Sequence, residues 1–117
     1  MNSSVTLRTQ ARLWYWQRMS AIVLALCVIV HLAVIMVAVR GGLTAGQVLQ
    51  RTRGNWAFAA FYAVFVLACT VHVPVGLLTI AEEWLGWRSR TAVVAAWLFA
   101  ALLAVAGLRA VYGVVMP

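Results

Sequence analysis

The sequence carries very little charge. Of its 117 residues only 9% are charged and 66% are hydrophobic, and it contains neither lysine nor aspartate. All nine basic residues are arginine, and the two acidic residues, Glu82 and Glu83, are neighbours. A water-soluble domain of this size could not keep such a composition off its surface without aggregating. The solvent for most of this chain is therefore lipid.

The common catalytic motifs are also missing. No nucleotide-binding loop, zincin helix, CxxC pair or Ser-His-Asp set is present, which argues against an independent hydrolase or transferase. Cys27 and Cys69 both lie in apolar runs, where small packing residues are expected rather than a disulfide. The net charge of +7 comes from arginines beside those runs and forms no stripe, so it indicates membrane topology and not a nucleic-acid partner.

Three apolar runs, 20–39, 56–81 and 91–115, are each about as long as the ~20 residues that cross ~30 Å of hydrocarbon. The first is longer than the apolar part of a signal peptide, so we expect a retained helix. Short connections predict an all-α, up-down-up bundle of three transmembrane helices, approximately 14–39, 56–82 and 91–115, in one membrane-anchor domain, 1–117.

The segments outside the runs add detail. Residues 1–12 predict a loose or interfacial tail, and the residues after Thr44 predict one short interfacial helical turn. Five arginines lie on the N-terminal side of the predicted membrane and three on the other, which favours an N-terminus in the cytoplasm. The five are Arg8, Arg12, Arg18, Arg88 and Arg90, and the three are Arg40, Arg51 and Arg53.

His72 is the first candidate ligand. A neutral imidazole is a good axial ligand for haem iron, and Gly76, one helical turn later, would leave room for a porphyrin. Pro74 between them leaves the carbonyl of Thr70 without its helical donor. The alternative is a histidine hydrogen-bonded inside the bundle, with Gly76 present only for close helix packing.

His31 lacks a glycine at the corresponding position, Ile35, so a buried polar contact or a pocket wall is favoured over a second haem ligand. If the first helix starts at Arg18, His31 lies ~20 Å from that end, and His72 lies ~17 Å from Glu83 on the same side. We therefore expect both histidines at similar depth, a geometry that permits a bis-histidine site within this chain.

Other polar residues lie nearer the predicted membrane surfaces. Arg109 is either an interfacial anchor or a partner for a haem propionate. A second group is expected to meet near the inner surface, where it would either bind and protonate a quinone or simply mark the membrane boundary. That group is Arg18, Ser20, Glu83 and Trp84.

In order and spacing these motifs resemble one family over almost the whole chain: the hydrophobic membrane-anchor subunits of succinate dehydrogenase, D-subunit type, of the cytochrome b family. The similar segments are 18–24, which begins Arg-Met-Ser-Ala, the His72 to Gly76 pair followed by Glu83, and 111–115, Val-Tyr-Gly-Val-Val. Two features differ from the family pattern. Trp84 stands where the family has a tyrosine, and a histidine at position 31 is not usual in this anchor type.

The resemblance implies that His72 is an axial ligand of haem b, with the second histidine supplied by a partner cytochrome b subunit. It implies that Arg18, Ser20, Glu83 and Trp84 lie near a ubiquinone pocket facing the iron–sulfur subunit, in a complex that also contains a flavoprotein subunit. The complex would lie in the bacterial inner membrane and pass electrons from succinate to quinone.

Three alternatives stay open at this point. The same anchor could serve fumarate reduction by menaquinol, because the helices do not set the direction of the reaction. The chain could also be a haem-free structural anchor. A small transporter is the least favoured, because proton coupling normally needs a carboxylate within the membrane and both acids here lie at a loop.

Overall fold

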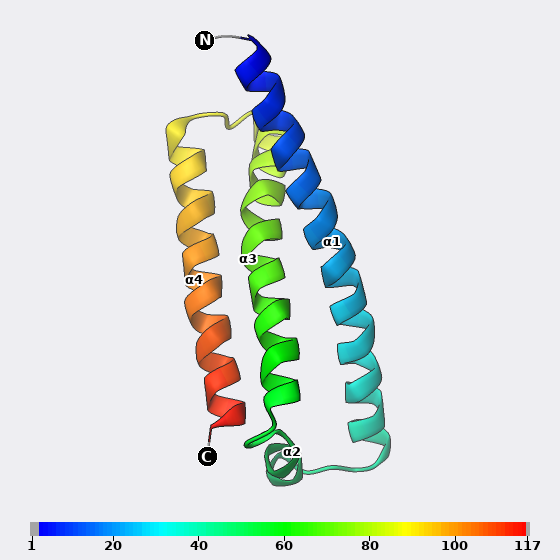
Figure 1. Ribbon diagram of the computed structural model, residues 1–117. Coiled ribbons are helices and arrows are strands. Elements are labelled where there is room, and N and C mark those ends of the chain that lie inside the picture. Colours follow the sequence, from blue (N-terminus) through cyan, green and yellow to red (C-terminus); the bar gives the residue numbers. More distant parts are fainter. Residues whose placement is uncertain (1–2, 117) are drawn as a thin grey trace.

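The computed structural model describes residues 3–116, and this part of the chain is helical with no strand. It contains α1 (Ser3–Arg40), α2 (Ala45–Thr52), α3 (Trp56–Leu85) and α4 (Arg90–Val115). Figure 1 shows α1, α3 and α4 as long helices running side by side in alternating directions, with α2 beneath them. All three are long and apolar enough to cross a membrane. The predicted all-α fold with three membrane-spanning helices is confirmed.

The first helix is longer than predicted. The expected loose tail over 1–12 is wrong for residues 3–12, which continue α1 without a break; residues 1–2 lie outside the described part of the chain. The segment contains no glycine or proline, and extending an existing helix costs far less than nucleating a new one. The helix therefore starts at Ser3 instead of at about residue 14.

The short helix α2 closes one end of the bundle. Thr44 caps it in a reciprocal capping box with Gln47, as the sequence predicted for a short turn here. Thr52, which is buried, donates a hydrogen bond of 2.7 Å from its hydroxyl to the carbonyl of Val114 in α4. The amide of Gly54 donates to the carbonyl of Val115, also at 2.7 Å. These bonds join α2 to the C-terminal end of α4.

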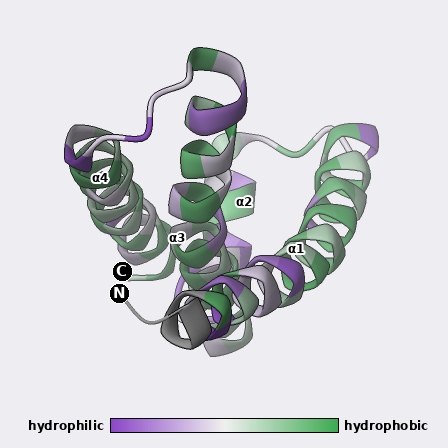
Figure 2. Ribbon diagram, turned by 90° about the horizontal axis from the view of Figure 1, so that it is seen from above, coloured by the Kyte–Doolittle hydropathy of each residue, from purple (hydrophilic) through white to green (hydrophobic). Residues whose placement is uncertain are grey.

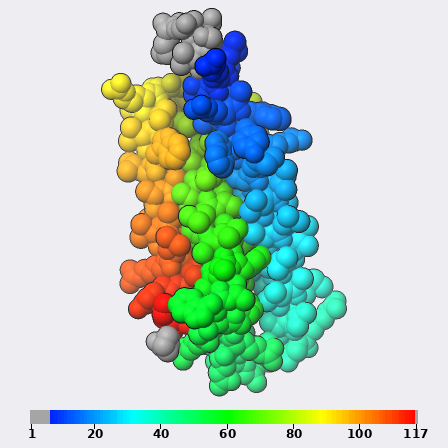
Figure 3. All heavy atoms as spheres, in the orientation of Figure 1, coloured from blue at the N-terminus to red at the C-terminus, as the bar shows by residue number. Residues whose placement is uncertain are grey.

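α3 is the central helix, with α4 packed along one side and α1 along another. Figure 3 shows α3 between the other two long helices on one face of the molecule. Small residues bring α4 close to α3, since Ala92, Ala96 and Ala100 are all buried. Cys27 is buried, Cys69 is partly buried, and both are free thiols, consistent with small packing residues.

Most apolar side chains point outward. Figure 2 shows apolar residues along the lengths of the helices and polar ones gathered toward their ends. Many large apolar side chains on α1 and α4 are exposed, for example Leu26 at 61% and Leu102 at 62%. In a bilayer such faces contact lipid or the helices of a partner, and only the inward faces need to pack within this chain.

The contact of Gly107 with α3 gives a stability prediction. A methyl group added at Gly107 would lie 2.8 Å from both methyl groups of Val66, whose side chain has little rotamer freedom in a helix. We expect Gly107→Ala to lower the free energy of unfolding in detergent by about 1–3 kcal/mol relative to Gly113→Ala. Gly113, also in α4, has no atom within 4 Å of the added methyl, so it controls for helix propensity. Equal thermal stability of the two variants would contradict this packing.

Candidate functional site

A polar network joins α1 to α3 around His72. The hydroxyl oxygen of Ser20 lies 3.3 Å from Nδ1 of His72, and the same hydroxyl donates to the backbone carbonyl of Gln17 at 3.0 Å. Ser20 is buried, with 6% of its surface exposed, and Pro74, close to His72 in α3, is fully buried. The network therefore lies at a tight contact between two membrane-spanning helices.

The hydrogen bonds of Ser20 favour one tautomer of His72. Ser20 has one hydroxyl proton, and that proton is donated to the carbonyl of Gln17. The remaining bond therefore has Nδ1–H of His72 as donor and Ser20 Oγ as acceptor. Nε2 is then unprotonated, which is the form in which a neutral imidazole binds a metal while its other nitrogen is held by a neighbour.

Gly76 faces α1 and not an empty space. A methyl group at Gly76 would lie 3.2 Å from Nε2 of the Gln17 side chain, so the glycine allows Gln17 to approach α3 closely. This contact supports the packing alternative for Gly76 over clearance for a porphyrin on that side. Within residues 3–116, the buried side-chain oxygen Oε1 of Gln17 has no hydrogen-bond partner, which leaves one acceptor free in this network.

His31 lies in a different environment, among aromatic residues of α3. Its Nδ1 is 3.1 Å from the hydroxyl of Tyr62, and its ring makes edge-on contacts with Tyr62 and Phe65, with centroids 5.6 and 5.9 Å apart. These three residues border a cavity of about 520 Å³ whose other walls come from α2 and α4. His31 is thus a wall of a mainly apolar pocket.

The two histidines are not at the same depth. His72 lies opposite Ser20, whereas His31 lies opposite Tyr62, ten residues away from His72 along α3. At ~1.5 Å per residue this is about 15 Å along the helix axis. The prediction of similar depth is wrong, because it assumed that α1 starts at Arg18, level with Glu83. A bis-histidine site within one copy of this chain is excluded by this register.

The four residues expected near the inner surface are also not brought together. Glu83 is eleven residues from His72, about 16 Å along α3, so it lies far from Ser20. Arg18 packs over the ring of Trp14, with 5.9 Å from its guanidinium carbon to the ring centroid. Glu83 and Trp84 are exposed near the end of α3, Trp84 at 82%. The position of α1 along α3 therefore separates Arg18 and Ser20 from Glu83 and Trp84, which the sequence analysis expected to meet.

Arg109 is exposed on α4 and does not line the cavity beside His31. It lies six residues from the end of α4 at Val115, about 9 Å, within the reach of an arginine that extends to the membrane surface. This position fits an interfacial anchor. Contact with a haem propionate stays a prediction.

Gln17 and Tyr62 are the functional candidates that sequence reasoning missed. Tyr62 could have been found as part of an aromatic stripe with Phe58 and Phe65 on one face of α3, although the sequence does not reveal that His31 faces it. Within the described residues, no group of three His, Cys, Asp or Glu side chains could hold a metal ion. Comparison with family models, curated proteins and solved structures gives no match.

The Ser20 bond to His72 makes a prediction that needs no cofactor. Losing one hydrogen bond of about 1 kcal/mol should lower the ratio of Nδ1–H to Nε2–H tautomer at His72 about fivefold in Ser20→Ala. Nitrogen-15 NMR of histidine-labelled protein measures this ratio. Tyr62→Phe is the matched control, because it removes a hydroxyl from His31 and should leave His72 unchanged. An unchanged His72 tautomer in Ser20→Ala would contradict the assignment.

Proposed function

We propose that this chain is a membrane-anchor subunit of a succinate:quinone oxidoreductase of the bacterial inner membrane, helping to bind haem b and ubiquinone. The observation that carries the proposal is the His72 network. A histidine with a buried hydroxyl on Nδ1 and a free Nε2, inside a membrane-spanning helix, matches the requirements of an axial haem ligand. Intramembrane ionisable residues are costly, which favours a function for this one.

His72 would hold the haem through Nε2, and Ser20 would fix the orientation of the imidazole. Because His31 is about 15 Å away along the helix axis, a second histidine ligand would have to come from another chain, the proposed partner cytochrome b subunit. Gln17 closes the α1 side of this part of α3, so the haem would lie on a side open to that partner. When bound, haem b supplies one-electron exchange.

Ubiquinone is the proposed substrate at the end of the bundle that carries Glu83 and Trp84. Its reduction takes two electrons and two protons, while succinate loses the same number at the flavoprotein subunit. Glu83 is the group at this end that could move a proton. Arg18, two residues from Ser20, lies closer to the depth of His72 and would have to reach along α1 to hold a carbonyl oxygen. Trp84 can donate a hydrogen bond but cannot relay a proton. Ser20, buried and bonded to His72, would act as a positioning residue for the histidine instead of contacting quinone.

The same end of the molecule would receive the iron–sulfur and flavoprotein subunits. It carries the N-terminal turns of α1 and the loop between α3 and α4, where Arg88 pairs with Glu82 at 3.2 Å. More charged groups gather there than at the α2 end, and both acidic residues are among them, so it is the more polar surface for soluble partners. An anchor serving fumarate reduction by menaquinol would use the same surfaces.

A haem-free structural anchor is the second candidate, because Gly76 packs on Gln17 and not on open space. In that case His72 would serve only to bind α1 to α3 through Ser20. The two candidates differ in a single measurable property, the presence of a haem spectrum in the purified complex.

The decisive experiment is to purify the tagged chain in mild detergent, identify the copurifying proteins and record reduced-minus-oxidised spectra. We expect a flavoprotein, an iron–sulfur protein and a bis-histidine haem band. His72→Ala should lose the band, and Ser20→Ala should weaken haem retention about tenfold or more. His31→Ala, which changes a histidine at the other depth, should keep the band and is the control. A His72→Ala complex with full haem content would rule out the ligand assignment.

A further inference from the structure

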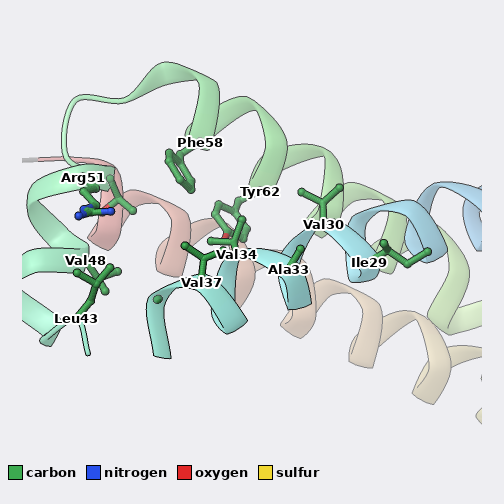
Figure 4. Close-up of a pocket in the computed structure, with 12 residues that line it drawn as sticks. Ile29, Val30, Ala33, Val34, Val37, Leu43, Val48, Arg51, Phe58 and Tyr62 are labelled. Carbon is green, nitrogen blue, oxygen red and sulfur yellow. The ribbon is translucent and has the colours of Figure 1, made fainter. Parts of the chain in front are cut away.

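A second hollow lies between α1 and α3 at the α2 end of the bundle, and it shares Val48, Thr52 and Tyr62 with the cavity beside His31. It has a volume of about 460 Å³. Aliphatic side chains of α1 form one wall, among them Ile29, Val34 and Val37, while Phe58 and Tyr62 of α3 form the other. Figure 4 shows these side chains along the length of the hollow, with Arg51 near one end and Ile29 at the other. We refer to it as the α1–α3 cleft.

The depth of the α1–α3 cleft matches one leaflet of a bilayer. Its lining on α1 runs from Ile29 to Ala38, nine residue steps or about 14 Å. Half of a ~30 Å hydrocarbon core is ~15 Å. A hydrocarbon chain that enters at the membrane surface beside α2 would therefore end near the bilayer centre, where the apolar walls also end.

The surface end of the cleft is positively charged. Arg51 of α2 lines the cleft, and Arg40 and Arg53 flank the same connection between α1 and α3. Both acidic residues of the sequence, Glu82 and Glu83, lie at the opposite end of α3. Within residues 3–116, the only ion pair is that of Arg88 with Glu82, so Arg51 has its guanidinium available for an external anion.

We propose that the α1–α3 cleft binds one anionic phospholipid, with an acyl chain along α1 and α3 and the phosphate held by Arg51. A guanidinium binds phosphate oxygens through two parallel hydrogen bonds, and basic pockets between membrane helices bind anionic headgroups. The apolar wall and the free cation thus fit the two halves of one amphipathic molecule.

A transmembrane helix of a partner fits the cleft less well. A helix with its side chains is about 10–12 Å wide and must reach water at both ends. The cleft is bounded at its surface end by Leu43, Val48 and Arg51 of the α2 region, which would obstruct such a helix. A lipid needs only to place its headgroup beside α2, so the lipid is the occupant that this geometry favours.

The test uses native mass spectrometry of the full chain, with any copurifying subunits, after delipidation. Dioleoylphosphatidylglycerol and dioleoylphosphatidylcholine are added in parallel titrations. We expect one phosphatidylglycerol molecule to bind tightly and phosphatidylcholine to bind with about fivefold lower affinity. Arg51→Gln should remove this preference, because it weakens phosphatidylglycerol more than phosphatidylcholine, whose phosphate Arg51 also contacts but whose choline offsets the charge. Arg53→Gln is the matched control, because Arg53 follows α2 but does not line the cleft, and it should keep the preference.

A second variant tests the apolar wall of the α1–α3 cleft, which would hold the acyl chain. Ala33→Phe, which fills the cleft, should weaken both lipids at least fivefold, whereas Ala25→Phe on an exposed position of the same helix should not. The proposal is overturned if Arg51→Gln keeps the preference, or if Ala33→Phe binds both lipids as the parent does. It is also overturned if millimolar inorganic phosphate alone displaces phosphatidylglycerol, or if crosslinking from position 33 in the native complex captures a partner helix. Should Ala33→Phe not fold, the Arg51→Gln comparison decides.

Discussion

The contact between Ser20 and His72 fixes the register of α1 against α3, and the positions of the other polar groups follow from that register. With Ser20 opposite His72, Gln17 lies against Gly76 and His31 lies against Tyr62. A shift of α1 by one turn would separate all three pairs at once. In lipid, where apolar contacts between helices gain little over contacts with acyl chains, such polar and close-packed pairs are what specify one arrangement.

Much of the architecture could be predicted from the sequence because a bilayer permits few solutions. Apolar runs of sufficient length must be helices, and short connections force neighbours to be antiparallel. The start of α2 followed from Thr44, whereas α3 runs three residues beyond the predicted end at 82 and is capped by Gly86, which adopts a left-handed conformation at φ 62°. Local signals of this kind were enough to predict that the chain forms three long helices and that neighbouring helices run antiparallel.

The site was predicted less well, for a physical reason. Depth along a helix depends on where the helix begins relative to its neighbour, and no local signal marks that offset when α1 simply continues through residues 3–12. The estimate that aligned Arg18 with Glu83 therefore misplaced His31, Ser20 and the proposed quinone residues together. The proposal for His72 does not depend on that offset, because it rests on the chemistry of imidazole, whereas Tyr62 and Gln17 are identified only by contacts between helices.

The unbroken length of α1 has a mechanical consequence. Its 38 residues span about 57 Å, more than the ~40–45 Å of a bilayer with its headgroups, so the helix cannot be contained within the membrane if it stands upright. Figure 1 shows its first turns standing beyond the loop that joins α3 to α4. A continuous helix is a stiff rod, so a soluble protein that grips those turns would be held at a set height above Ser20, about 26 Å from Ser3. If the bound protein tilted those first turns, the stiff helix would pass the movement on to Ser20, whose hydroxyl contacts His72.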